Sequence, residues 1–156
     1  MKYIKLRSGR ISKVDEEDFE KLSKYKWLEN VKMNTSYAVA SILSDDKKDR
    51  VHIKMHRIVM NAPKGMDVDH LNGNGLDNRK CNLRICTKSQ NGMNKGILNR
   101  NTSGFKGIYR KHRKWIAQIG VNNKRIRIGS FNTPEEAYKA YCEAAIKYHG
   151  EFARLK

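Results

Sequence analysis

The chain has 156 residues, enough for one domain or for two small domains with modest cores. Its 33 Lys and Arg against 16 Asp and Glu give a formal net charge of +17, so a compact fold would repel itself unless it bound a polyanion. This balance favours nucleic acid as the partner, and it argues against a membrane protein because no long apolar run or basic amphipathic helix is present.

The cysteines exclude a disulfide framework. Cys81, Cys86 and Cys142 are an odd number and lack the short-spaced pairs of a zinc ribbon. We expect half-buried thiols in a reducing compartment and no structural zinc. No leader-like segment opens the chain, so we expect a cytoplasmic protein.

The N-terminal third has the pattern of a scaffold. We expect a strand over residues 3–6, a helix within residues 14–27 that begins at Asp15, and strands over residues 37–42 and 50–53.

His52 and His56 have the i, i+4 spacing of a metal pair on a helix. No third ligand accompanies them, so packing or a phosphate contact is the favoured interpretation.

The densest chemistry lies in the middle of the chain. Asp69-His70 is followed by Asn82 and then by Asn91, and carboxylate and amide oxygens can hold a hard cation while an imidazole activates water. A strand end at residues 68–70, an Asn-Gly turn at residues 72–75, a returning strand at residues 83–85 and a capping box from Thr87 to Gln90 would bring 69, 70 and 91 together. A lone Asp-His pair is more often a surface capping feature, but the combined spacing favours a nuclease site.

This stretch resembles the HNH (ββα-metal) endonucleases, especially the small homing-type enzymes of phages and mobile introns. The residues that carry the resemblance are Met55-His56-Arg57, Val68-Asp69-His70-Leu71-Asn72-Gly73, Asp77-Asn78-Arg79-Lys80-Cys81-Asn82-Leu83-Arg84 and Ser89-Gln90-Asn91.

The resemblance implies a role for each matched position. His70 would be the general base, and Asp69 and Asn91 would hold one Mg²⁺ or Mn²⁺. Asn82 would brace the loop and orient the His70 ring. Three arginines would contact phosphates, although each could equally be a solvated surface charge: Arg57, Arg79 and Arg84.

Residues 92–102 form a basic, Asn- and Gly-rich linker between the two halves. We expect Lys95 and Arg100 to contact the DNA backbone there.

From Ser103 onward the pattern predicts three short strands and a helix. Trp115, Ala117 and Ile119 form one apolar face, and Ile126 and Ile128 face inward while the neighbouring arginines face outward. The segment Thr133-Pro134-Glu135-Glu136 starts a helix that Gly150 ends, with an inner stripe of Ala137, Ala140, Tyr141, Ala144 and Tyr148.

Residues 103–156 resemble the APETALA-type (ethylene-response-factor) DNA-binding domain. The carrying residues are Ser103-Gly-Phe-Lys-Gly-Ile108, Lys114-Trp115-Ile-Ala-Gln-Ile119, Ile128-Gly-Ser-Phe131, Thr133-Pro-Glu-Glu-Ala-Tyr-Lys-Ala-Tyr141 and His149-Gly150. By position, the resemblance puts the DNA face on Lys106, Tyr109, Lys111, Gln118, Arg125 and Arg127. Gln118 and Arg127 replace a typical acid and a typical tryptophan, so base specificity does not carry over. Trp115 is expected to pack against the helix rather than stack on a base.

The sequence thus predicts an α+β protein with three parts: an HNH nuclease domain with an N-terminal scaffold over residues 1–91, a linker over 92–102 and a sheet-and-helix module over 103–156. Its predicted function is site-selective, divalent-metal-dependent cleavage of double-stranded DNA by a monomer, with a second copy needed if both strands are cut. The resemblance suggests a bacterial or phage-infected cell. A non-catalytic DNA-binding regulator on a decayed nuclease scaffold is the alternative, and an RNA-binding protein ranks last.

Overall fold

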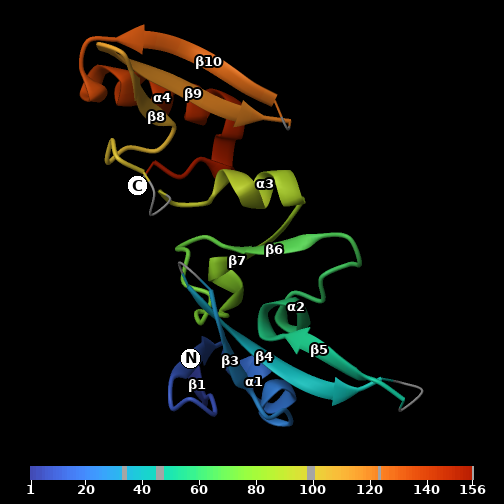
Figure 1. Cartoon of the computed structure of the whole chain (residues 1–156). Helices are drawn as coiled ribbons and strands as arrows, with labels where there is room; N and C mark the ends of the chain where they lie inside the picture. The colour runs from blue at the N-terminus through green and yellow to red at the C-terminus, as the bar shows by residue number, and fades with distance from the viewer. Residues whose placement is uncertain (33–34, 45–47, 98–100, 123, 156) are drawn as a thin grey trace. The chain divides into compact units, whose positions relative to one another are not determined.

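The computed structural model describes residues 1–32, 35–44, 48–97, 101–122 and 124–155. It divides into two compact units, Met1–Cys86 and Thr87–Lys156. Both units combine small antiparallel sheets with few helices (Figure 1), which confirms the mixed α and β character of the predicted class. The division puts residues 87–91 in the second unit, whereas the predicted limits 1–91, 92–102 and 103–156 follow sequence motifs and stay a prediction.

Within its described residues, the first unit contains three sheets and three helical segments. Its strands are β1 (Lys2–Lys5), β2 (Ile11–Val14), β3 (Leu28–Val31), β4 (Ser36–Leu43), β5 (Arg50–Lys54), β6 (Asp67–His70) and β7 (Leu83–Cys86). Its helical segments are α1 (Glu16–Ser23), α2 (Met55–Val59) and the 3-10 turn η1 (Lys80–Asn82). β1 pairs with β2, β3 with β4 and β5, and β6 with β7, all antiparallel.

Apolar residues far apart in sequence share one core in this unit. Leu22 of α1 and Val14 of β2 are fully buried in it, and Trp27, Met55 and Leu83 pack in the same cluster. At about 25 cal/mol per Å² of apolar surface, such burial is the main term that holds the N-terminal scaffold against the β6–β7 hairpin.

The two spaced histidines lie on different elements. His52 is exposed on strand β5, whereas His56 is buried on helix α2. The helical i, i+4 geometry of a metal pair is therefore not formed, and the packing interpretation is confirmed for His56.

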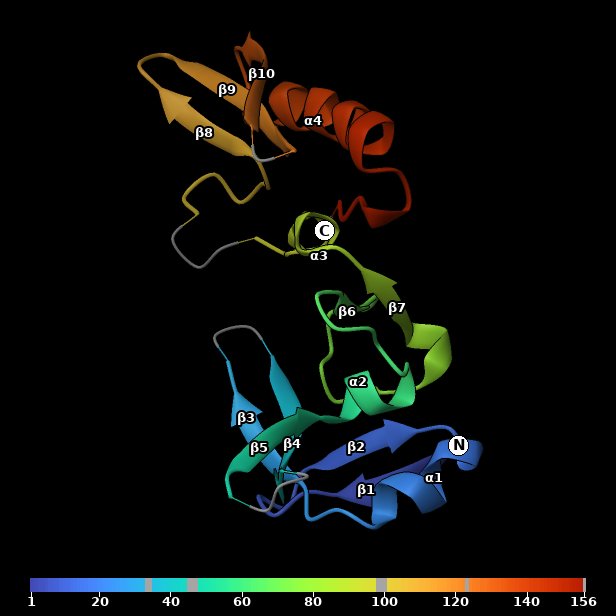
Figure 2. The same cartoon turned by 90° about the vertical axis from the view of Figure 1, so that its right-hand side faces the viewer.

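The second unit begins with a short helix, α3 (Lys88–Met93), followed by a sheet and a long helix. The remaining elements are β8 (Ile108–Lys111), β9 (Lys114–Val121), β10 (Lys124–Phe131), α4 (Pro134–His149) and η2 (Gly150–Phe152). The sheet order is β10-β9-β8, and α4 covers one of its faces (Figure 2). The predicted three-stranded sheet with one packed helix is confirmed.

The inner stripe of α4 differs from the prediction at its end. Ala137, Tyr141, Ala145 and His149 are buried at a strict four-residue spacing, and Tyr148 is exposed. The difference arises because the His149 ring reaches the sheet, where Nε2 donates to the carbonyl of Gly120 at 2.8 Å. On β10, Ile126 is more exposed than predicted, and the pairing register shifts between Arg127 and Gly129.

Both predicted capping boxes are present. Thr87 and Gln90 start α3, and Thr133 and Glu136 start α4, each pair exchanging two side-chain to backbone hydrogen bonds. Within the part of the chain that the structure describes, no helix is both long and apolar enough to span a membrane.

Candidate active site

Asp69 and His70 end strand β6 and are both buried, with about 5% of each residue exposed. β7 fixes their backbone, because Asp69 pairs with Arg84 and His70 with Leu83 in the antiparallel register. Carboxylates are seldom buried without a partner, so burial of both groups side by side indicates a built polar site rather than a surface capping feature.

A chain of hydrogen bonds orients the imidazole. His70 Nε2 lies 3.3 Å from Oδ1 of the fully buried Asn78, and Asn78 Nδ2 donates to Ser12 Oγ at 2.8 Å. Since the amide nitrogen is used toward Ser12, the amide oxygen accepts from His70, and Nε2 carries the proton of the neutral ring. The nitrogen with basic character is then Nδ1.

A second buried histidine lies against the first. The ring of His56, from α2, meets the ring of His70 edge to face at 5.1 Å, and the ring of Tyr37 lies within 6 Å of both. Burial and the neighbouring His70 lower the pKa of His56 to about 3. Burial also lowers the pKa of His70, against the opposing effects of Asn78 and Asp69. Both imidazoles are therefore neutral at neutral pH, which is the form a general base requires.

Asp69 forms a buried ion pair with Arg84. Nε and Nη2 of Arg84 lie 3.0 and 2.7 Å from the same oxygen, Asp69 Oδ2, and the two side chains are only 13% and 7% exposed. Arg84, which was predicted to contact a phosphate, is thus turned inward in this structure. Its guanidinium balances the carboxylate that the resemblance assigns to a cation.

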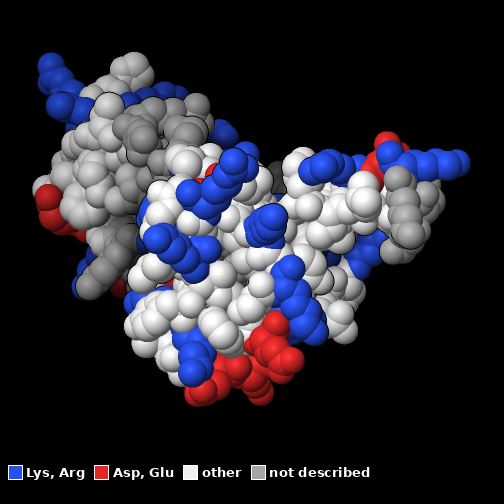
Figure 3. All heavy atoms as spheres, turned by 90° about the horizontal axis from the view of Figure 1, so that it is seen from below, with Lys and Arg blue, Asp and Glu red and all other residues white. Residues whose placement is uncertain are grey.

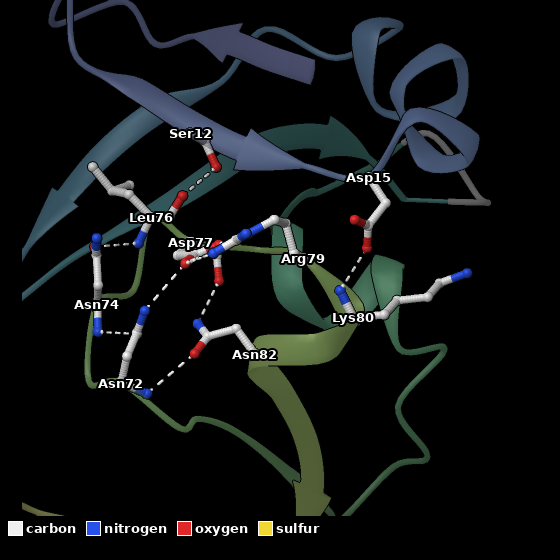
Figure 4. A network of polar contacts seen from close by, with 9 residues as sticks. All are labelled: Ser12, Asp15, Asn72, Asn74, Leu76, Asp77, Arg79, Lys80 and Asn82. Atoms are coloured by element: carbon white, nitrogen blue, oxygen red, sulfur yellow. Dashed lines mark hydrogen bonds and ion pairs between the residues drawn. The ribbon is translucent and has the colours of Figure 1, made fainter. Parts of the chain in front are cut away.

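The loop between β6 and β7 is held by its own side chains (Figure 4). Asn82 Oδ1 accepts from the backbone nitrogen of Asn72 at 3.1 Å, and Asn82 Nδ2 donates to the carbonyl of Asp77 at 2.8 Å. Asn82 therefore braces the loop as predicted. The side chain beside His70 Nε2 is that of Asn78, and orientation of the ring by Asn82 stays a prediction.

Two further arginines hold the loops of this unit. Arg79 forms a bidentate pair with Asp77, with both contacts at 2.7 Å, and this pairing holds the pKa of Asp77 below its usual range. Arg57 donates to the carbonyls of Met66, Ala62 and Pro63, which fastens the segment after α2. Arg57, Arg79 and Arg84 were predicted at the DNA, but all three are engaged within the unit.

Strand β2 and Asp15, which follows it, are part of the same framework. The carboxylate of Asp15, at the N-cap position of α1, makes no cap hydrogen bond and instead accepts from the backbone nitrogen of Lys80 at 2.7 Å. Backbone bonds also join Lys13 to Leu76 and to Asn78. The backbone of Ser36 comes so close to Gly75 that a Cβ there would lie 2.5 Å from the Ser36 carbonyl oxygen, so this position requires glycine.

Asn91, the second predicted ligand, is the fourth residue of α3 in the second unit, and its backbone nitrogen donates to the carbonyl of Thr87.

No cluster of three or more His, Cys, Asp or Glu side chains suited to a metal occurs in the described ranges. The predicted set of one carboxylate and one amide still fits Mg²⁺, which usually takes one or two carboxylates and completes its shell with water and phosphate. It does not fit structural zinc.

Sequence reasoning missed Asn78, Ser12 and His56 as parts of the site. Asn78 and His56 lie inside the stretch that resembles the HNH enzymes, which is the signal that could have pointed to them. Ser12 lies 66 residues before its partner Asn78 and has no such signal.

The charges of the first unit are partly neutralised locally. On the face drawn in Figure 3, the largest group of acidic side chains lies at the lower edge, while Lys and Arg are spread over the face. Helix α1 opens with Glu16, Glu17 and Asp18; Lys2 pairs with the first of these acids and Lys80 with the other two. Residues 103–156, with 12 Lys and Arg against 4 Asp and Glu, carry a denser positive charge.

In the second unit, the strand register puts one set of polar side chains on the sheet face opposite α4. Tyr109 pairs with Ile116, Arg127 with Gln118 and Arg125 with Gly120. Trp115 lies on the other face, partly buried against the α4 core, and Arg110 stacks over its ring at 5.8 Å. The packing interpretation of Trp115 is confirmed.

The remaining predicted contacts divide into three cases. Lys111 is exposed at the end of β8, and Lys95 is exposed after α3. Lys106 is half-buried and its ammonium is bound to backbone carbonyls. Arg100 lies outside the described residues.

A buried carboxylate beside a neutral imidazole, in a strongly basic chain, supplies a possible general base for the hydrolysis of a nucleic acid. Comparisons with known proteins agree. A family described as HNH endonuclease matches residues 54–93, and one described as AP2 domain matches residues 103–151.

Three relatives illustrate the two halves. Protein 3.8 of Escherichia phage T7 is 31% identical over 113 residues, which cover 70% of this chain and 93% of that protein. The uncharacterized HNH endonuclease L560 of Acanthamoeba polyphaga mimivirus is 31% identical over 134 residues, which cover 85% and 67%. Ethylene-responsive transcription factor ERF010 of Arabidopsis thaliana is 48% identical over 54 residues, which cover 33% of this chain and 29% of that factor. The chain belongs to the HNH endonuclease family and carries an AP2 domain at its C-terminal end.

Proposed function

We propose that the protein is a site-selective, divalent-metal-dependent DNA endonuclease of the homing or mobile-element type. The observation that carries this proposal is the neutral, buried His70 imidazole, tied through Nε2 to Asn78 and adjacent to the Asp69 carboxylate. The AP2 domain supports duplex DNA as the substrate, because a basic three-stranded sheet can enter a major groove.

In the proposed reaction, Nδ1 of His70 takes a proton from the attacking water while Asn78 and Ser12 hold the ring in its tautomer. Asp69 and Asn91 would hold one Mg²⁺ or Mn²⁺, as the resemblance to the HNH enzymes implies. When bound, such an ion offsets negative charge on the phosphate and on the leaving oxygen. Asn82 holds the loop after His70 through its bonds to the backbone of Asn72 and Asp77.

Docking and cutting are assigned to different parts. The sheet face with Tyr109, Lys111, Gln118, Arg125 and Arg127 would set the position of the cut. A monomer with one site makes one nick per encounter, so cleavage of both strands needs a second copy or a second binding event.

The Asp69–Arg84 ion pair favours one alternative, a DNA-binding regulator on a decayed nuclease scaffold. A guanidinium on Asp69 Oδ2 stands where a cation would be needed. In the active enzyme, Arg84 would share the carboxylate or turn toward a phosphate when the cation binds.

Supercoiled plasmid separates the two candidates. The enzyme converts it to open circles with Mg²⁺ or Mn²⁺ and not with a chelator, whereas the regulator leaves it intact under all conditions. His70→Ala should abolish the conversion and leave DNA affinity within a few-fold, since the base acts on water. Equal loss of cleavage and binding would refute the role of His70, and sequencing the cut ends would reveal the target.

A further inference from the structure

The helix that carries Asn91 is held at its C-terminal end by two cations from later in the second unit. Lys106 Nζ donates to the carbonyl of Met93 at 2.5 Å and to the carbonyl of Arg154 at 3.5 Å. Arg154 Nη1 donates to the carbonyl of Asn94 at 3.5 Å. All these residues belong to the second compact unit.

Helix α3 needs such support. It has six residues, and isolated helices of this length are not stable in water. The capping box at Thr87 satisfies its first amides, and the carbonyls at its other end carry the negative end of the helix dipole. Cations placed on those carbonyls fix the end of the helix and its direction.

Lys106 is in an unusual state for a DNA contact. Its side chain is half-buried, and burial together with the nearby Arg154 lowers its pKa to about 8. An ammonium that contacts phosphate is normally exposed and strongly hydrated. This lysine is committed to protein carbonyls instead.

We infer that Lys106 and Arg154 form a clasp that positions α3, and with it Asn91, on the DNA-reading unit. Lys106 is then a positioning residue for cleavage and not a DNA contact. The inference rests on the proposed function, in which Asn91 is a metal ligand. Its consequence is that the predicted ligand Asn91 is carried by the unit that reads DNA.

The test uses the full chain, supercoiled plasmid and a Mg²⁺ titration, with four variants. Lys106→Met and Arg154→Met remove the two cations of the clasp, Lys106→Arg keeps a donor, and Lys139→Met removes an exposed lysine of α4 as the matched control. Three quantities are measured: the cleavage rate at saturating plasmid, the Mg²⁺ concentration for half-maximal rate, and the Kd for a labelled duplex from the same plasmid in chelator.

We expect Lys106→Met to lower the saturated rate, or to raise the Mg²⁺ requirement, by about tenfold or more, the usual effect of losing a group that orients a metal ligand. Kd should change by less than about threefold, since the lost group does not touch DNA. Lys106→Arg should recover most of the loss, and Lys139→Met should match wild type.

Other outcomes overturn the inference. An unchanged Mg²⁺ requirement and saturated rate with a weakened Kd would make Lys106 a DNA contact. If thermal melting shows that Lys106→Met does not fold, Arg154→Met takes its place, and its saturated rate, Mg²⁺ requirement and Kd are compared with those of wild type in the same way. Asn91→Ala tests the underlying function separately: wild-type cleavage in Asn91→Ala would remove Asn91 from the site, whatever the clasp variants do.

Discussion

The two contacting histidines make the first unit sensitive to acid. His56 has a pKa of about 3 in the folded protein against 6.5 for the free side chain, so the unfolded chain binds more protons between these values. The contribution of the neutral His56 ring to the free energy of unfolding is complete above pH 6.5 and is lost as the pH falls toward 3. With about 1.4 kcal/mol per pKa unit, the loss between pH 7 and pH 5 is about 2 kcal/mol.

His56→Phe isolates this effect. Phenylalanine keeps the aromatic contact with His70 and removes both the titration and the buried Nδ1 that has no hydrogen-bond partner. We expect the variant to be at least as stable as wild type at pH 7 and to lose about 2 kcal/mol less on going to pH 5. His52→Asn, at the exposed histidine, is the matched control and should retain the wild-type slope.

The assay is urea unfolding at pH 7 and pH 5, followed by the fluorescence of Trp27. Trp27 is buried in the core of the first unit, and a Trp115→Phe background removes the other tryptophan. If His56→Phe loses as much stability as wild type between the two pH values, the reasoning from the buried imidazole is refuted.

Three further predictions concern the site, the DNA face and the thiols. Asn78→Leu should slow cleavage by about 10-fold to 100-fold without weakening DNA binding, because the ring loses the acceptor that sets its tautomer; an unchanged plasmid-nicking rate would contradict this. Arg125→Ala with Arg127→Ala should weaken binding by roughly 1–3 kcal/mol per base contact and flatten the salt dependence of Kd, measured by fluorescence anisotropy between low and moderate salt. Cys81, which is exposed, should react with maleimide in the native protein, whereas Cys86, whose burial raises its pKa to about 11, should react only after unfolding; mass spectrometry of the labelled peptides reads out both.

The elements were predictable where local chemistry decides them. The caps at Thr87 and Thr133 and the turn at residues 72–75, in which Gly73 has a positive φ, depend on residues within a few positions of each other, and all three formed as predicted. The positions of Asp69 and His70 at the end of a strand followed from the same kind of pattern.

Long-range partners were not predictable. A basic side chain in a sequence shows its charge but not its counterion, so Arg57, Arg79 and Arg84 were assigned to phosphate when the fold had used them on carbonyls and carboxylates. The same holds for the ring of His70. Its partner Asn78 is held in turn by a hydrogen bond to Ser12, which lies far away in the chain. Lys106 shows the effect most clearly. Its position in the family pattern predicts a contact with DNA, but its ammonium donates to backbone carbonyls.

The attachment of strand β2 to the loop after His70 limits how this enzyme can be recombined. Ser12, Lys13 and Asp15 supply hydrogen bonds to residues 76–80, and those bonds cross more than sixty positions of sequence. A chimera that grafts only the matched segment 54–93 onto another DNA-reading module would leave these partners behind and release the imidazole from its set orientation. An exchangeable cleavage cassette must therefore include strand β2.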